Sequence, residues 1–327
     1  MELTVIIPTR ERVAILCETL DRLEPQLREV PFEVIVVDDG STDTTGDVVA
    51  RRAAASPFQL VLIQQSGSGP AAARNRALGA ARAPVCLFID DDKWARDGLL
   101  ARHTNFHRRN PEREAALLGH IVIAEQPPPT RFMRWLATQH LGFAGIQDPQ
   151  DAGGRHFFTG NVSAKTDFIR EAGGFDEGFT SAAHEDIDLG MRLQEQGLRL
   201  VYDRDAVVEH YHPSDLPMAI ERMRDMGRAN ARFAERHPRR PVPRRPDVRH
   251  RVKAGGLAAL AALGVRSSRV QHETWRFLCH EAFREAYWRE VDAGKHGGEA
   301  PEQEGLRIGR RLARLARRDE DAAMPPS

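Results

Sequence analysis

The first ninety or so residues repeat one pattern, in which a short run of apolar and β-branched residues precedes a segment with apolar residues at helical spacing. The spacing predicts strands at residues 3–7, 33–37, 59–64 and 85–89, and helices at 14–27, 44–55 and 70–81. Strands that alternate with helices of about 10 to 14 residues form parallel sheets through right-handed crossovers. The sequence therefore predicts an α/β fold with a mostly parallel central sheet flanked by helices.

Polar residues follow each of the four predicted strands. They are Pro8-Thr9, Asp38-Asp39, Ser66-Gly67 and Asp90-Asp91-Asp92. The carboxyl ends of parallel strands share one edge of a sheet, and ligands bind there. These residues are therefore expected to line one crevice, although they are far apart in the sequence.

Three consecutive carboxylates, Asp90, Asp91 and Asp92, end the fourth predicted strand. They repel one another and need a counter-charge. Hard divalent cations such as Mg²⁺ or Mn²⁺ bind oxygen ligands and often bridge to substrate phosphates. The triplet favours a metal-diphosphate site, and the alternative is a solvated acidic turn with Asp97 capping the next helix.

A glycine motif competes with this interpretation. Residues 67–72, GSGPAA, match the G-x-G-x-x-A fingerprint of dinucleotide-binding proteins between a strand and a helix. The motif lies in the third strand-helix unit rather than the first, and three acids end the fourth strand where one ribose ligand is expected. A nicotinamide enzyme is therefore disfavoured.

The composition bounds the remaining classes of protein. With 327 residues, the chain has room for about two domains, or for one large α/β domain with an appendage. The formal net charge of zero argues against a general nucleic-acid binder. Three widely separated cysteines, the absence of a long apolar run and the lack of a signal-peptide pattern lead us to expect a cytoplasmic protein.

Several segments together carry a family resemblance. In the first half they read VIIPTRER from Val5, VVDDGSTDTT from Val36, GPAAARNRALGAA from Gly69 and LFIDDD from Leu87; in the second half they read FTGNVSAKTDFIREAGGFDEGF from Phe158, HEDIDLGMRLQEQG from His184 and AVVEHYHP from Ala206. The chain resembles the family 2 glycosyltransferases of the GT-A fold over residues 1–235. The resemblance implies a nucleotide-sugar-binding half at 1–125 and an acceptor half at 126–235.

The resemblance also implies which residues bind the donor. Thr9 and Asp39 would hold the nucleotide base, and Arg74 the diphosphate, with the rest of the set at Pro8, Arg10, Glu11, Asp90 and Asp91. A carboxylate at Asp39 can accept the N3–H of uracil or thymine, which favours UDP or dTDP over GDP donors. The alternatives are an Asx-capped turn at Asp38-Asp39 and a solvated helix face at Arg74.

Asp92 matches the acid that the family uses as a direct metal ligand for Mg²⁺ or Mn²⁺, and His210 matches its metal-binding histidine. Val208, His210 and His212 alternate as in a strand, so their side chains are expected on one face. The alternative is a surface histidine near the end of a strand, since imidazole is an optional ligand for Mg²⁺.

Asp186 is the candidate catalytic base that the resemblance implies. His184, Glu185 and Asp186 precede a helical pattern, and the alternative is that these acids merely favour the helix N-terminus. In the family's inverting reaction, Asp186 would take the proton from an acceptor hydroxyl. Contacts to donor or acceptor sugar are expected from Gly160, Asn161, His184 and Glu185.

These expectations combine into transfer of a single sugar to a hydroxyl group of a glycan, lipid-linked or small-molecule acceptor. Processive members of the family carry Q-x-x-R-W after the acidic pair, whereas residues 131–135, RFMRW, precede Asp186 and are expected to form a helix on the sheet. The alternative function is a catalytically silent sugar-nucleotide-binding or scaffold module. A nucleotidyltransferase is disfavoured because its glycine-rich, lysine-containing N-terminal loop is missing.

The remaining residues differ in composition. Residues 236–251 are rich in Arg and Pro and indicate an extended linker, and 252–327 are expected to form a helical C-terminal extension. Residues 303–327 predict a basic amphipathic helix, which fits peripheral contact with the inner face of an anionic membrane. The alternatives for this helix are packing on the catalytic domain or a subunit contact in a homo-oligomer.

Overall fold

The structure is a computed structural model. It describes residues 1–140, 142–238, 242–245, 252–253, 255–257, 259–260 and 267–296. The chain divides into two compact units, one formed by Met1–Thr130 and Leu136–His212, the other by Arg131–Trp135 and Pro213–Ser327. This division falls at His212, ahead of the boundary expected at residue 235. The functional ranges expected on either side of residue 235 remain predictions.

The first unit is built on one sheet with the strand order β3-β2-β1-β4-β7-β6-β8-β5. Its strands are β1 (Leu3–Thr9), β2 (Phe32–Asp39), β3 (Gln59–Gln65), β4 (Val85–Phe88), β5 (Lys93–Ala95), β6 (Ala115–Ile123), β7 (Val162–Lys165) and β8 (Arg199–His210). The first four strands are parallel, as predicted from their alternation with helices. β7 is antiparallel to both β4 and β6, and β5 is antiparallel to β8. The expected mostly parallel sheet is confirmed.

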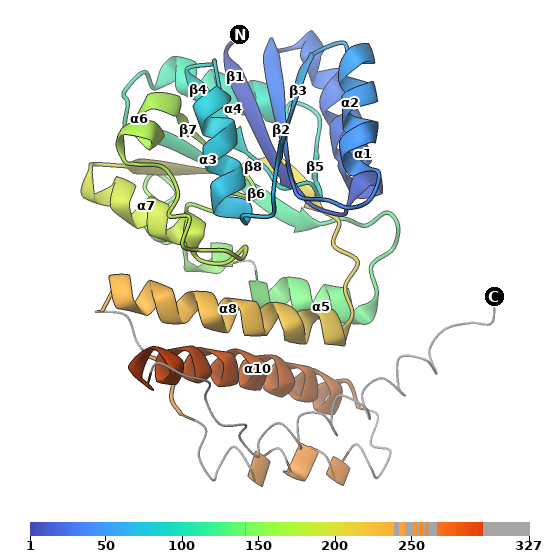
Figure 1. Ribbon diagram of the computed structural model, residues 1–327, viewed down its shortest axis with the longest axis vertical. Coiled ribbons are helices and arrows are strands. Elements are labelled where there is room, and N and C mark those ends of the chain that lie inside the picture. The colour runs from blue at the N-terminus through green and yellow to red at the C-terminus, as the bar shows by residue number, and fades with distance from the viewer. Residues whose placement is uncertain are drawn as a thin grey trace, which may run out of the picture. The chain divides into compact units, whose positions relative to one another are not determined.

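Helices cover both faces of this sheet, and Figure 1 shows α3 crossing the face toward the viewer. The helices and 3₁₀ turns of the first unit are α1 (Val13–Leu23), η1 (Glu24–Arg28), α2 (Thr45–Ala55), α3 (Pro70–Ala80), α4 (Leu99–Arg109), η2 (Gly142–Gly145), η3 (Gly154–His156), α6 (Thr166–Glu171) and α7 (Glu185–Glu195). Alternate residues of β1 pack into different apolar clusters, with Ile6 in one and Val5 and Ile7 in the other. This alternation explains why the central strands are apolar on both faces.

The carboxyl ends of β1, β2 and β4 lie at one edge of the sheet, because these strands are parallel and adjacent. A turn after β4 carries the acid triplet directly into β5. The short β5 pairs with the last residues of β8, so that Lys93 lies opposite His210. This ladder brings two segments that are more than a hundred positions apart to the same edge.

The second unit is helical in the part that the structure describes. Its two long helices are α8 (Leu216–Arg236) and α10 (Ser268–His296). A Cβ atom at Gly227 of α8 would lie 2.3 Å from the carbonyl oxygen of Phe283 in α10. The two helices therefore approach each other at a distance that admits only glycine at this crossing.

Residues 131–135 form the start of α5 (Arg131–His140), which confirms the expected helix. Phe132 and Trp135 pack against Trp275 of α10, with ring centroids 5.0 Å and 5.4 Å apart. These aromatic rings belong to the core of the helical unit. The expected packing of this segment on the sheet remains a prediction.

α10 confirms a helix in the expected C-terminal extension. Most of the Arg/Pro-rich linker and the whole basic amphipathic segment at 303–327 lie outside the described residues. The membrane contact and the homo-oligomer contact expected from them remain predictions. Among the described residues, no helix combines the length and the apolar character that crossing a bilayer requires.

Candidate functional site

Each carboxylate of the acid triplet contacts a basic side chain. Asp90 accepts a hydrogen bond from Arg74 at 2.9 Å, and Asp91 accepts one from Arg12 at 2.7 Å. Asp92 forms an ion pair with Lys93 and a second contact with Arg12 at 3.0 Å. Asp91 and Asp92 are each 4% exposed, so the alternative of a solvated acidic turn is wrong for these two residues.

The pKa values of the three carboxyl groups are shifted in different directions. Burial raises the pKa of Asp91 to about 6 despite the nearby Arg12. Burial also disfavours the charged form of Asp92, yet Lys93 and His210 hold its pKa well below the usual range. In Asp90, Lys93 and Arg74 outweigh burial and lower the pKa. Asp92 is thus kept ionised and able to bind a cation.

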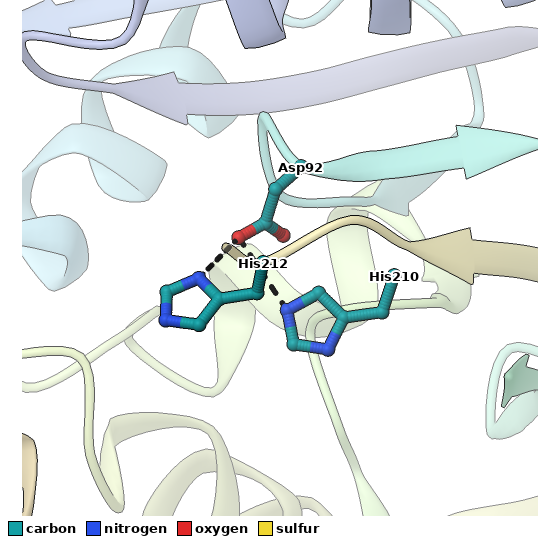
Figure 2. Close-up of side chains that lie close together, drawn as sticks. All are labelled: Asp92, His210 and His212. Carbon is teal, nitrogen blue, oxygen red and sulfur yellow. Dashed lines mark hydrogen bonds and ion pairs between the residues drawn. The ribbon is translucent and has the colours of Figure 1, made fainter. Parts of the chain in front are cut away.

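Asp92, His210 and His212 form a cluster whose ligand atoms lie within 4.8 Å of one another (Figure 2). Asp92 Oδ2 is 3.2 Å from His212 Nδ1 and 3.4 Å from His210 Nε2. The β5–β8 ladder sets this geometry, and it is extended by a hydrogen bond from the Tyr211 amide to the Asp92 carbonyl at 2.9 Å. His212 lies two residues beyond His210 and outside the strand, but its ring still faces Asp92.

The donor set of this cluster fits a divalent transition metal. One carboxylate oxygen and two imidazole nitrogens suit Mn²⁺, whereas Mg²⁺ prefers an environment of oxygen ligands. Burial and the nearby Lys93 lower the pKa of His210, which favours the neutral imidazole that metal ions bind. The structure brings together the two predicted metal ligands, Asp92 and His210, and adds His212.

Arg74 of α3 joins the acid triplet to the first turn of α7. Its Nη1 donates to Glu185 Oε1 at 2.6 Å, and its Nη2 donates to Asp90 Oδ1. Arg74 and Glu185 are 3% and 2% exposed, so the alternative of a solvated helix face for Arg74 is wrong. Glu185 Oε1 is engaged by Arg74, and the contact of Glu185 with a sugar remains a prediction.

Asp186 follows Glu185 in the first turn of α7. Its Oδ1 accepts the Ile187 amide at 2.8 Å, while Oδ2 has only a long contact of 3.4 Å from the Thr159 amide. Desolvation raises the pKa of Asp186 to about 7, and the negative charge of Glu185 adds to this effect. Asp186 is therefore a carboxylate that gains and loses a proton near neutral pH.

His184 immediately precedes α7 as its N-cap and has a left-handed backbone with φ of 67°. A non-glycine residue with this conformation is uncommon and marks a sharp turn. The turn sends the chain from the preceding loop directly into the two acids. His184 therefore lies directly before Glu185 and Asp186, at the turn that leads into α7.

The loop after β1 is tied to neighbouring elements of the predicted crevice. Thr9 follows Pro8 and donates to Asp91 Oδ2 at 2.7 Å, and Glu11 accepts the Thr42 amide at 2.7 Å. A Cβ atom at Gly67 would lie 3.5 Å from the guanidinium of Arg10. Segments from the ends of four strands, β1 to β4, therefore meet here, as the sequence predicted.

Asp39 lies beside the glycine motif at residues 67–72. Its carboxylate accepts the Ser68 and Gly69 amides at 2.7 Å and 2.9 Å, and the Gln65 side chain at 2.7 Å. A carboxylate has about four lone-pair positions, so about one remains for a ligand. The main role of Asp39 in this structure is to hold the loop that begins α3.

Gly160 and Asn161 are neighbours in the sequence but have different surroundings in the structure. A Cβ atom at Gly160 would lie 3.5 Å from Asp90 Oδ2, so Gly160 borders the site. Asn161 is 0% exposed; its amide donates to the carbonyls of His120 and Ala206 and its oxygen contacts His103. The expectation that Asn161 contacts a sugar is wrong, because every polar group of its side chain is used inside the protein.

Sequence reasoning missed Arg12, Lys93 and His212 as members of the site. Arg12 ends the first quoted motif, and Lys93 follows the acid triplet directly. The repulsion among three carboxylates already called for counter-charges, and adjacent basic residues could have been proposed for that role. His212 belongs to the same alternating run as His210, but the family resemblance predicts only His210 as a ligand.

Comparisons with known proteins agree with this geometry. A sequence profile described as glycosyl transferase family 2 matches residues 4–165, and one described as glycosyl transferase family group 2 matches residues 85–272. Validoxylamine A glucosyltransferase of Streptomyces hygroscopicus subsp. jinggangensis is 33% identical over 233 residues, which cover 62% of this chain and 54% of that protein. The chain spans about half the length of the first curated relatives it matches.

Two solved structures share the fold. Staphylococcus aureus TarS 1–349 in complex with UDP has a TM-score of 0.53 at 20% identity, covering 91% of this chain and 92% of that one. Mannosyltransferase PcManGT from Pyrobaculum calidifontis in complex with GDP-Man and Mn²⁺ has a TM-score of 0.54 at 17% identity, covering 99% and 88%. At these identities the likeness concerns the fold, and it confirms the expected GT-A architecture.

Proposed function

The chain belongs to glycosyltransferase family 2, and on that premise we propose that it moves one sugar from a nucleoside diphosphate sugar to an acceptor hydroxyl, with inversion at the anomeric carbon. One observation carries this proposal. Arg74 contacts both Asp90 and Glu185, so the acid triplet and the candidate base Asp186 belong to a single site. A donor diphosphate bound at the triplet would then lie near a carboxylate able to accept a proton.

UDP or dTDP is the nucleotide we favour for the donor. The lone-pair position left on Asp39 suits the N3–H of uracil or thymine. Binding by the loop with Pro8, Thr9, Arg10 and Glu11 is part of the same proposal. A fold neighbour binds UDP and another binds GDP-Man, so the choice of base is a question for direct measurement.

Asp92, His210 and His212 would hold a divalent cation, with Mn²⁺ favoured over Mg²⁺ because two of the three donors are nitrogen. Such an ion supplies positive charge to the departing diphosphate. The presence of Mn²⁺ in the complex of the mannosyltransferase neighbour supports the choice.

Asp186 would act as the general base. The acceptor oxygen forms a bond to the anomeric carbon, the bond from that carbon to the diphosphate oxygen breaks, and the hydroxyl proton passes to Asp186 Oδ2. This oxygen is the less engaged of the two, with one long contact at 3.4 Å. A pKa of about 7 suits a base that works at neutral pH.

The acceptor class comes from the sequence resemblance and stays broad: a glycan, a lipid-linked sugar or a small molecule. Relatives support a glycan acceptor, since one is named poly(ribitol-phosphate) beta-glucosyltransferase. The cytoplasmic location and the peripheral membrane contact are further parts of the proposal that the described residues do not bear on.

The experiment uses the full chain with UDP-, dTDP- and GDP-sugars, with and without Mn²⁺. A ligand that binds the folded state raises the melting temperature, so a thermal-shift panel identifies the donor. Transfer of the labelled sugar is then measured on an acceptor panel with wild type and Asp186→Asn. We expect donor binding in both proteins and transfer in wild type alone. Donor binding without transfer or donor hydrolysis in wild type would support the silent binding module.

A further inference from the structure

Lys93 is a buried cation inside the acid triplet, and neither the sequence motifs nor the proposed chemistry gives it a role. Lys93 is 5% exposed. The ammonium forms an ion pair with Asp92 Oδ1 and lies 3.4 Å from Asp90 Oδ2. Among the residues that the structure describes, these two carboxylates are its ion-pair partners.

The backbone holds Lys93 at this position. It is the first residue of β5, opposite His210 in the antiparallel ladder, and its amide donates to the Asp90 carbonyl at 3.2 Å. The same ladder fixes the histidine of the cation cluster. Lys93 and the ligand atoms are therefore parts of one rigid arrangement.

Three basic side chains contact the triplet, namely Arg74, Arg12 and Lys93. Arg12 and Arg74 also contact other groups, His212 and Glu185, so the charge of Arg74 is shared with a fourth carboxylate. The ion pairs of Lys93 are with the triplet alone among the described residues, so its charge directly reduces the negative charge around Asp92.

Carboxylates whose charge is largely offset by buried cations attract a free divalent cation less strongly than unpaired ones. A nucleotide diphosphate brings its own negative charge and its own oxygen ligands. With Asp92 Oδ1 held by Lys93, Oδ2 is the oxygen that faces His210 and His212. The cation and the diphosphate would then complete the site together.

We propose that Lys93 makes binding of the divalent cation conditional on the nucleotide diphosphate, by offsetting one negative charge of the triplet and holding Asp92 with Oδ2 toward the histidines. Lys93 is a positioning residue in this scheme, because it acts through Asp92. The inference rests on the proposed function, and it adds an order of events. The free protein binds little metal, and the metal and the donor then bind together.

The test measures Mn²⁺ affinity of the full chain by electron paramagnetic resonance, without and with saturating UDP. Wild type is expected to bind Mn²⁺ at least tenfold more tightly with UDP. Lys93→Met keeps the length of the side chain and removes its charge, so it should bind Mn²⁺ at least tenfold more tightly than wild type without UDP. In Lys93→Met, UDP should therefore increase Mn²⁺ affinity less than it does in wild type. By linkage, Mn²⁺ should increase UDP affinity less by the same factor.

Two variants serve as controls. Lys93→Arg keeps the charge and should restore the dependence on UDP. Lys165→Met removes a lysine whose ammonium donates to the backbone carbonyls of His107 and Asn110, away from the triplet, and should leave Mn²⁺ affinity unchanged.

The inference is overturned if folded Lys93→Met, checked by circular dichroism, binds Mn²⁺ no more tightly than wild type without UDP. If that variant does not fold, wild type alone decides, because equal Mn²⁺ affinity with and without UDP also overturns it. Sugar transfer is assayed separately in wild type. Active protein with UDP-independent Mn²⁺ binding ends this inference and leaves the proposed function standing.

Discussion

Arg74 and Glu185 form a buried ion pair at 2.6 Å although 111 positions of chain separate them. The pair connects α3, which follows the glycine motif, to the first residue of α7. Because Asp186 is next to Glu185, one guanidinium connects the acid triplet to the candidate base. The position of the candidate base therefore depends on a residue of α3.

Arg74→Met should strongly destabilise the protein. Removing one partner of a buried ion pair leaves an uncompensated charge, which costs about 3–5 kcal/mol, and here Glu185 loses its cation. The free energy of unfolding in urea measures the loss. The double variant Arg74→Met/Glu185→Met removes both charges and should recover part of the stability. Stability of Arg74→Met within 1 kcal/mol of wild type would contradict a structural role for the pair.

The rate of sugar transfer should rise with pH through about 7, because Asp186 accepts a proton only when ionised and its pKa is raised to about 7. Glu185→Gln removes a negative charge that raises this pKa, so the midpoint of the pH profile should move to lower pH. The profile of kcat/KM from pH 5 to 9 measures both effects. A wild-type midpoint near the usual carboxylate range, about 4, would argue against Asp186 as the titrating base.

Replacement of either histidine of the cation cluster should weaken Mn²⁺ binding. Loss of a residue that only supports a metal ligand lowers metal affinity roughly 10- to 100-fold. Loss of one of the three ligands themselves should therefore lower Mn²⁺ affinity by at least this factor when it is measured with saturating UDP. His210→Ala and His212→Ala should affect Mn²⁺ more than Mg²⁺, since Mg²⁺ prefers oxygen. His280→Ala, on the exposed face of α10, is the control. Unchanged Mn²⁺ affinity in His212→Ala would remove that residue from the ligand set.

The strands and helices of residues 1–89 were predictable because local pattern and burial agree there. The strand expected at 33–37 lies within Phe32–Asp39, and the helix expected at 44–55 is Thr45–Ala55. Alternating β1 residues enter two apolar clusters, as a strand covered on both faces requires.

The roles of single side chains were less predictable, because they depend on depth and on partners distant in sequence. Asn161 stands beside Gly160 in the motif, yet it is fully buried and Gly160 borders Asp90. Glu185 adjoins the base in sequence, but a residue from α3 neutralises it. Sequence alone could not tell whether the counter-charge of the triplet was a metal ion or Lys93, and the structure supplies the lysine.

Acid should destabilise the first unit through two buried histidines of α4. Burial lowers the pKa of His103 to about 4 and that of His107 to about 2, and both contact Ser163. The unfolded chain binds protons below its ordinary histidine pKa of about 6.5, whereas the folded chain does not. Stability should therefore fall as pH drops below that value.

The expected loss at pH 5.5 is on the order of 1 kcal/mol per histidine relative to pH 7.5. Urea unfolding at both pH values measures it. His103→Asn keeps a polar side chain that does not titrate, and its stability should depend less on pH. An equal pH dependence in His103→Asn and wild type would show that other groups dominate the acid response.

Gly190→Ala should displace the helix that carries Asp186. Gly190 lies in α7, and an added Cβ would be 2.1 Å from the carbonyl oxygen of Gly154 and 2.4 Å from the Cβ of Phe157. Neither neighbour is the end of a flexible side chain, so the helix itself must move. Overpacking of this kind costs about 1–3 kcal/mol, and a shift of about 1 Å at a reacting group lowers rates by up to about 10²-fold.

Gly79→Ala is the matched control, because Gly79 lies in α3 and an added Cβ there meets no atom within 4 Å. Replacing a glycine inside a helix by alanine raises the free energy of unfolding by about 0.5–1 kcal/mol when there is space for the methyl group. We expect Gly79→Ala to be at least as stable and as active as wild type, and Gly190→Ala to lose stability and transfer. If the two variants behaved alike, the close contact between α7 and η3 would not be what positions Asp186.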